Sequence, residues 1–193
     1  MYFKTKLRKI IVVFVSIGLW LWPLSVKAQD VTDRQISWKN FETGYTVVQY
    51  QKTEDLIRFD RQIDFSVDRG GIKSLFSSDS KYTALSIKKK MDAIYLRVQE
   101  ILDMRKKMKK IVIKIYPKNQ FGPVRYKKTR SDHPIRSWYI YEENTIYINV
   151  DDVHEGILAH EIAHAVIDHY MLVRPPRATA EILAAYVDKN LFY

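Results

Sequence analysis

The alternation of apolar and polar residues predicts a chain in which strands and helices follow one another. Short runs rich in β-branched and aromatic residues predict strands, and apolar residues three or four positions apart predict helices. The predicted strands cover residues 45–50, 111–116, 137–141 and 146–150, the last two forming a hairpin, and the predicted helices cover residues 83–109, 152–170 and a segment from about 179. This order predicts an α+β fold with a small mixed or antiparallel sheet.

The remaining segments carry weaker patterns. Residues 30–43 are polar with scattered aromatic side chains and predict an irregular lead-in. Residues 55–66 are too mixed in period to assign. Residues 68–71, 77–82 and 117–137 predict turns or loops from their glycine, proline and polar residues.

One predicted helix carries an H-E-x-x-H motif formed by His160, Glu161 and His164. Residues four apart lie on one face of a helix, so the two imidazoles can bind one Zn²⁺ at about 2.0–2.1 Å. Glu161 projects beside them and is placed to accept a proton from a zinc-bound water. Asp152 and Glu155 have the spacing of a capping box, which predicts the start of this helix. The alternative is that the histidines are structural residues of an amphipathic helix.

A third zinc ligand is expected downstream, because the sequence has no cysteine and two histidines do not complete a zinc site. Pro175 and Pro176 end the first helix, and a second helix is predicted to begin near Thr179. Glu181 lies in the first turn of that predicted helix and is the carboxylate best placed to reach the metal. The alternative is that Glu181 only interacts favourably with the helix dipole.

Together these residues resemble the gluzincin zinc metallopeptidases, the group that includes thermolysin and the aminopeptidases. Sequences of that family often carry Asn-Glu-Gly-x-Ala-x-Tyr-x-Glu around the third ligand. The residues that match this pattern in type and position are Glu181, Ala184, Tyr186 and the acidic Asp188. The chain departs from the pattern at Ala180 and Ile182, which stand in place of Asn and Gly. The strong likeness covers about residues 151–190.

The resemblance implies a zincin-like metallopeptidase domain in which the sheet packs on the active-site helix and a second helix bears a ligand. It implies one Zn²⁺ per chain, held by His160, His164 and Glu181, with Glu161 as the catalytic base. Because the chain ends at Tyr193, soon after the second helix, we expect a minimal lower subdomain and an open cleft.

The resemblance also implies roles around that cleft. In the family, the edge strand above the metal pairs with extended substrate, which implies that role for residues 137–141. The alternative is an aromatic hairpin that only packs on the core. A side chain must stabilise the oxyanion, and His133, Tyr139 and Tyr186 are the candidates. Asp188 is expected either to orient a ligand histidine or to be solvated.

Two further histidines near the motif are predicted to point away from the metal. His154 lies about 120° around the helix from His160, and His169 lies on the opposite face. His154 is therefore expected to face the surface or a loop.

Residues 1–28 are predicted to be a secretory signal peptide. Basic residues precede an apolar run from Ile10 to Leu24, and Val26-Lys27-Ala28 offers a cleavage site before Gln29. The run is shorter than a membrane span of about 20 residues, and an uncleaved N-terminal anchor is the alternative. We expect a periplasmic or secreted protein with a single domain over residues 29–193 and no disulfides.

The chain carries a formal net charge of +10, which falls to +5 without residues 1–28 because these hold five basic and no acidic residues. The basic run 105–110 is assigned to the C-terminal end of helix 83–109, where cations interact favourably with the helix dipole. Weak contact with anionic envelope polymers or lipid headgroups is the alternative. No nucleic-acid-binding module is recognisable, so nucleic acid is not an expected partner.

The sequence therefore predicts an exported zinc-dependent metalloendopeptidase that acts on a peptide or protein substrate with a zinc-bound water activated by Glu161. One alternative is a non-catalytic or latent zinc-binding envelope protein, which the presence of Glu161 disfavours. Another is a zinc peptidase that acts on cell-wall peptides and differs only in its substrate.

Overall fold

The computed structural model describes residues 37–65, 80–129 and 135–193, with the backbone alone at residues 80–82 and 129. Residues 35–193 form one compact unit. The predicted signal peptide and the turn predicted at 68–71 lie outside the described residues. None of the helices in the described ranges is both long and apolar enough to cross a membrane.

The described residues form five strands and five helices, which confirms the predicted α+β class. The strands are β1 (Lys39–Glu42), β2 (Thr46–Tyr50), β3 (Ile111–Tyr116), β4 (Ser137–Ile140) and β5 (Thr145–Asn149). The helices are α1 (Thr53–Gln62), α2 (Ser80–Leu102), α3 (Lys118–Thr129), α4 (Glu155–Tyr170) and α5 (Arg177–Asn190).

The strands form one mixed sheet in the order β1-β2-β3-β5-β4. The two inner pairs, β2 with β3 and β3 with β5, are parallel, and the two outer pairs are antiparallel. β4 and β5 pair with Ser137 opposite Ile148 and Ile140 opposite Thr145, so the predicted hairpin is confirmed. Its first strand, β4, lies at one edge of the sheet.

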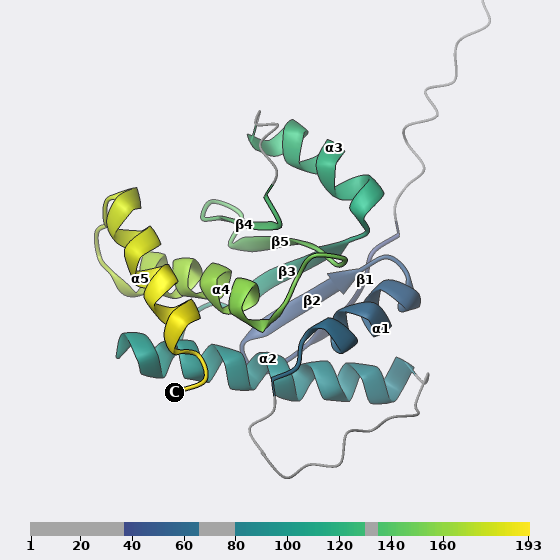
Figure 1. Ribbon diagram of the computed structural model, residues 1–193, viewed down its shortest axis with the longest axis horizontal. Helices are drawn as coiled ribbons and strands as arrows, with labels where there is room; N and C mark the ends of the chain where they lie inside the picture. Colours follow the sequence, from purple (N-terminus) through teal and green to yellow (C-terminus); the bar gives the residue numbers. More distant parts are fainter. Residues whose placement is uncertain (1–36, 66–79, 130–134) are drawn as a thin grey trace, which may run out of the picture. The chain divides into compact units, whose positions relative to one another are not determined.

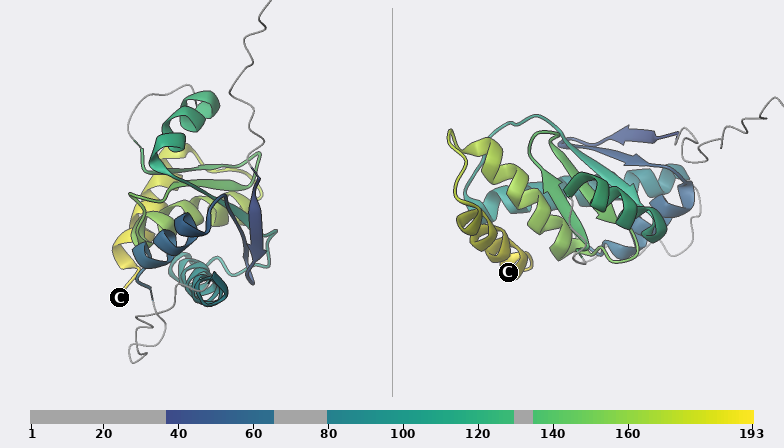
Figure 2. Two further views of the ribbon diagram at one scale, coloured as in Figure 1. Left: turned by 90° about the vertical axis from the view of Figure 1, so that its right-hand side faces the viewer. Right: turned by 90° about the horizontal axis from the view of Figure 1, so that it is seen from above.

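The alternation of side chains along the strands separates two apolar clusters. Ile113 and Ile115 of β3 belong to the main core, which also holds buried residues of α1, α2, α4 and α5. Tyr116 belongs to a smaller aromatic cluster that includes Phe121 of α3. Figure 1 shows α2 below the sheet and α3 above it, and the left view of Figure 2 shows the same separation. α4 therefore packs on the main-core face, beside the edge strand β4.

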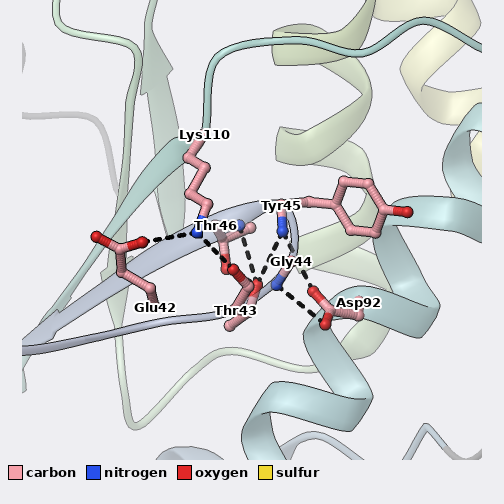
Figure 3. A network of polar contacts seen from close by, with 7 residues as sticks. All are labelled: Glu42, Thr43, Gly44, Tyr45, Thr46, Asp92 and Lys110. Carbon is pink, nitrogen blue, oxygen red and sulfur yellow. Dashed lines mark hydrogen bonds and ion pairs between the residues drawn. The ribbon is translucent and has the colours of Figure 1, made fainter.

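A polar network fixes the turn between β1 and β2 against α2 and the start of β3 (Figure 3). Asp92 of α2 accepts hydrogen bonds from the backbone N–H groups of Gly44, at 3.1 Å, and Tyr45, at 3.3 Å. Lys110 donates from Nζ to Glu42 Oε2 at 2.7 Å and to the Thr43 carbonyl at 2.8 Å. The charge of Lys110 is therefore already paired within the fold.

Two elements of the N-terminal half differ from the prediction. β1 lies within residues 30–43, which are predicted to be irregular, because it pairs with β2 and such pairing is not visible in a local pattern. α1 begins two residues before the unassigned segment 55–66 and covers its first part. Its residues Leu56 and Phe59 are buried, and their spacing of three residues marks the face that packs on the core.

The loop predicted over residues 117–137 is wrong where α3 forms. This helix includes Pro123, which cannot donate a backbone hydrogen bond. Phe121 of α3 is buried, and its ring centroid lies 4.8 Å from that of Trp138. Packing of this aromatic side chain against the sheet stabilises α3 despite the proline.

The boundaries of α2 also differ from the predicted helix 83–109. The helix begins at Ser80, inside the predicted polar loop 77–82, and ends at Leu102. The basic run 105–110 therefore lies beyond the helix, and its assignment to the last helical turn is wrong.

A Schellman motif ends α2. The Met104 N–H donates to the Gln99 carbonyl at 2.9 Å, and the Asp103 N–H donates to the Glu100 carbonyl at 3.1 Å. Asp103 has a φ of 51°, the left-handed conformation that this motif requires. Backbone N–H groups thus satisfy these carbonyls near the helix end, which need no basic side chain.

The two C-terminal helices begin close to their predicted positions. α4 begins three residues after Asp152, and His154 is its N-cap, with Nδ1 accepting from the Gly156 N–H at 3.2 Å. The predicted cap at Asp152 is wrong, because that carboxylate instead accepts from the Asn149 side chain. α5 begins two residues before the predicted Thr179.

Candidate metal centre

The candidate centre lies between α4, which carries His160 and His164, and α5, which carries Glu181. The two helices pack against each other. The small residues buried on them are Gly156, Ala159, Ala163, Ala165, Ala180 and Ala184. Small side chains allow two helices to approach closely, which brings a ligand on one helix within reach of ligands on the other.

The three predicted ligand atoms lie at the corners of a nearly equilateral triangle. Nε2 of His160 and Nε2 of His164 are 3.2 Å apart. Oε2 of Glu181 lies 3.4 Å from the first nitrogen and 3.5 Å from the second. In the described part of the chain, this is the one group of three or more His or acidic side chains close enough together to hold a metal ion.

This spacing fits a tetrahedral zinc site. Ligands bonded to Zn²⁺ at about 2.0–2.1 Å in tetrahedral geometry lie about 3.4 Å from one another. The three distances in the protein bracket that value. Two imidazole nitrogens and one carboxylate oxygen are also a donor set that Zn²⁺ accepts, and three protein ligands leave one position open.

The environment of His164 suits metal binding. Burial lowers the pKa of His164, and the nearby carboxylate of Glu181 opposes that shift. A lowered pKa keeps the imidazole neutral, which is the form that binds a metal.

Glu181 itself is half exposed and also lies 3.6 Å from Nε of Arg177, one turn earlier on α5. Because α5 begins at Arg177, Glu181 lies in its second turn, and the predicted place of Glu181 in the first turn is wrong.

Glu161 is buried beside the two histidines. Burial raises the pKa of Glu161 to about 7, with the negative charge of Glu181 adding to the rise. Hydrogen bonds from the Ser137 hydroxyl, at 2.7 Å, and from the Tyr139 backbone oppose it. A carboxyl group whose pKa is near neutral can both accept and return a proton, as general acid–base catalysis requires.

Some backbone N–H and C=O groups of the edge strand β4 point away from the sheet. The Asn149 N–H of β5 donates to the Arg136 carbonyl at 3.1 Å, so these two residues form a hydrogen-bonded antiparallel pair. Hydrogen-bonded and non-hydrogen-bonded pairs alternate. The backbone groups of Ser137 and Tyr139 therefore point outward, which agrees with the hydrogen bond from Tyr139 to Glu161.

The candidates for stabilising an oxyanion differ in their surroundings. The Tyr139 hydroxyl lies 3.0 Å from Nε2 of His169, so it is engaged at the C-terminal end of α4. Tyr186 is 52% exposed on α5. His133 lies outside the described residues. Within the described ranges, Tyr186 is the candidate whose side chain is more open to solvent.

The remaining acidic and histidine candidates lie away from the ligand triangle. His154 is exposed and caps α4, which agrees with its predicted surface position. Asp188 is exposed and lies against Gly156: a Cβ added to this glycine would be 2.2 Å from Oδ1 of Asp188. This position agrees with the expectation of a solvated Asp188.

Sequence reasoning did not identify the side chain of Ser137 as part of the site. Its hydroxyl and Glu161 are separated by 24 positions in the sequence, and nothing local to either residue marks the pair. The period-two pattern of the predicted strand could have placed Ser137 and Tyr139 on one face. That pattern does not say which helix the face contacts.

Comparisons with protein-family models, with curated proteins and with solved structures found no match to this chain. The metal centre is therefore interpreted from its own residues and geometry.

Proposed function

We propose that this protein is an exported zinc-dependent metalloendopeptidase with a zincin-like fold. The observation that carries the proposal is the triangle of His160 Nε2, His164 Nε2 and Glu181 Oε2, with the buried carboxyl of Glu161 next to it in the sequence. A metal site that only stabilises a fold has no use for a general base at that position. The apolar run in residues 1–28 supports export.

His160, His164 and Glu181 would hold Zn²⁺. When bound, Zn²⁺ would polarise the peptide carbonyl and lower the pKa of a water molecule. Glu161 accepts a proton from the attacking water and delivers it to the amine that leaves. Its burial and its hydrogen bond from the Ser137 hydroxyl support this role, because they hold the carboxyl in place next to the two histidines.

The substrate would lie along the outer edge of β4. The outward backbone groups of Ser137 and the carbonyl of Tyr139 can pair with an extended peptide, which would add a strand to the sheet. The Tyr139 N–H is already engaged, because it donates to Glu161. Such pairing recognises a backbone and not a particular side chain, so it suits an endopeptidase with broad sequence preference. It would also bring a peptide carbonyl close to Glu161, since Ser137 already contacts that residue.

The test combines zinc content with activity in the purified protein and its Glu161→Gln variant. Zinc is measured by atomic emission, and cleavage is measured on casein and on a quenched peptide library with and without a chelator. Glu54→Gln on α1 is a matched control, because Glu54 is exposed and belongs to another helix.

One zinc per chain in all three proteins, with cleavage lost only in Glu161→Gln and on chelation, would support the proposal. One zinc per chain without cleavage in any of them would favour a non-catalytic zinc protein or a narrow substrate such as a cell-wall peptide. A protein that binds no zinc would exclude all three zinc-dependent interpretations.

A further inference from the structure

The segment that follows α2 carries exposed cations. Arg105, Lys106, Lys107 and Lys109 are all exposed. Within the described ranges, none of these four side chains forms a hydrogen bond or an ion pair. Because the Schellman motif already satisfies carbonyls at the end of α2, these cations are not needed to cap the helix.

The backbone that carries these cations is held in place by the fold. Met104 is buried and Met108 packs against the main core. The Gln99 side chain donates from Nε2 to the Lys106 carbonyl at 2.9 Å. The basic segment is therefore an ordered feature of the surface and not a free tail.

An exposed apolar tip lies in the turn between α4 and α5. Leu172 is 101% exposed and Val173 is 80% exposed. Pro175 and Pro176 follow after Arg174 and restrict the backbone before α5 begins. Two adjacent apolar side chains thus project into solvent from a turn that the prolines restrict.

The basic segment and the apolar tip lie at the same end of the molecule. Asn144 connects them: its Nδ2 donates to the Lys110 carbonyl at 2.9 Å, and its Oδ1 lies 3.0 Å from Nε2 of His169, near the end of α4. Burial is the main cause that lowers the pKa of His169, and Lys109 is close enough to add to that lowering. Figure 1 and the right view of Figure 2 show the C-terminal ends of α2 and α4 on the same side.

We infer that this end of the protein docks on an anionic lipid bilayer, with the basic segment on the headgroups and Leu172 and Val173 inserted at the interface. Cations alone would suit any polyanion, whereas an exposed apolar tip beside them is the combination that binds an interface between charged headgroups and acyl chains. Arg174 is not counted, because it already pairs with Asp168 at 2.9 Å and lies 3.8 Å from Glu142.

The chain has no cysteine, so one introduced cysteine gives a unique fluorescent label. The full chain with Leu172→Cys, labelled with an environment-sensitive dye, is mixed with vesicles of phosphatidylcholine alone or with an equal part of phosphatidylglycerol. A label at Tyr126→Cys on α3, which is also exposed, serves as the control position. Both label positions share any N-terminal contact with the vesicle, so a response at position 172 that is absent at position 126 reports on this end of the protein.

The charge dependence is tested by changing Arg105, Lys106, Lys107 and Lys109 to Gln together. The matched control changes the same number of exposed cations elsewhere, at Lys39, Lys88, Lys89 and Lys127. Each cation near an anionic surface raises partitioning roughly fivefold, so loss of the four cations of the basic segment is expected to weaken binding by roughly several hundredfold. The matched control is expected to bind far more tightly than the variant without the basic segment.

The inference would be supported by a blue shift of the dye at position 172, without one at position 126, that occurs only on the vesicles containing phosphatidylglycerol. A dye at 172 that stays in water on both vesicles would overturn it, and so would equal weakening by the two charge variants. Binding to soluble polyphosphate is measured as well. If the protein binds polyphosphate tightly through the same four cations and the tip does not insert into vesicles, the partner is a soluble polyanion and not a bilayer.

Discussion

Ser137 and Glu161 are joined by a hydrogen bond of 2.7 Å between the edge strand β4 and the helix α4. Ser137 is buried, and the backbone of Tyr139 donates to the same carboxyl group. Two donors from one strand therefore fix the carboxyl that we propose as the general base. The hydroxyl and the Tyr139 N–H stabilise the charged form of Glu161, while burial stabilises its neutral form.

Replacing Ser137 by Ala is expected to lower kcat about ten- to a hundredfold with a small change in KM, because the hydroxyl orients Glu161 and does not itself bind the substrate backbone. Ser137→Thr keeps a hydroxyl and is expected to recover most of kcat. Steady-state kinetics and zinc content are measured for both variants. A loss of zinc in Ser137→Ala, or a change confined to KM, would contradict a role in orienting the base.

Glu181→Ala is expected to lose high-affinity zinc binding, because it leaves two ligands where three are needed. In the unchanged protein, added zinc is expected to raise the Tm, since it binds the folded chain, and this rise should disappear in Glu181→Ala. Without zinc the two proteins should have similar Tm values, because Glu181 is half exposed. Arg177→Ala, which removes only the 3.6 Å ion pair to Glu181, should keep its zinc-dependent rise.

The parts of the site that could be predicted from the sequence depend on local geometry. Four-residue spacing on a helix places His160 and His164 on one face whatever the rest of the fold does. The hairpin over residues 137–150 is likewise a local pairing. Glu181 could be predicted as the third ligand because zinc chemistry limits the choice of that ligand in a chain without cysteine.

The parts that could not be predicted depend on contacts between distant segments. The bond between Ser137 and Glu161 requires that β4 lie beside α4, which no local pattern specifies. The helix α3 forms because Phe121 packs on Trp138, against the local effect of Pro123. The end of α2 was missed because Asp103 occupies a left-handed position in which glycine is the usual signal.

Asp103→Gly is expected to raise the free energy of unfolding by about 1 kcal/mol. Asp103 has a φ of 51° at the end of α2, and a residue without Cβ adopts that conformation with less strain. Asp103→Ala is the control, and it is expected to destabilise the protein because Ala tolerates that conformation poorly. Urea unfolding in the presence of a chelator measures both, and a shift of the two variants in the same direction would contradict the assignment.

The folded protein is expected to lose stability as the pH falls below about 6.5, in part through His169. Burial lowers the pKa of His169 below its ordinary value, and Lys109 and Arg174 add to the shift against the opposing effect of Asp168. The unfolded chain then binds more protons than the folded one, so the free energy of unfolding decreases with falling pH. Tm values between pH 8 and pH 5 in chelator should fall less steeply for His169→Gln, and an equal slope would contradict this assignment.

Gly156 and Asp188 link the start of α4 to α5, and their coupling is expected to control how the metal ligands meet. A Cβ at Gly156 would lie 2.2 Å from Oδ1 of Asp188 and 3.2 Å from Cε1 of the capping residue His154. Gly156→Ala must therefore displace the carboxylate and disturb the cap, at a cost of about 1 kcal/mol.

Asp188→Ala removes the closer of these contacts, so Gly156→Ala should be tolerated better in that background, where Ala also favours the helix. A double-mutant cycle by urea unfolding measures the coupling, and zinc affinity is measured on the same four proteins. We expect Gly156→Ala to weaken zinc binding and the double variant to recover it, because the packing of α5 on α4 sets the distance from Glu181 to His160 and His164. Strictly additive effects on both quantities would mean that the start of α4 and the metal ligands are positioned independently.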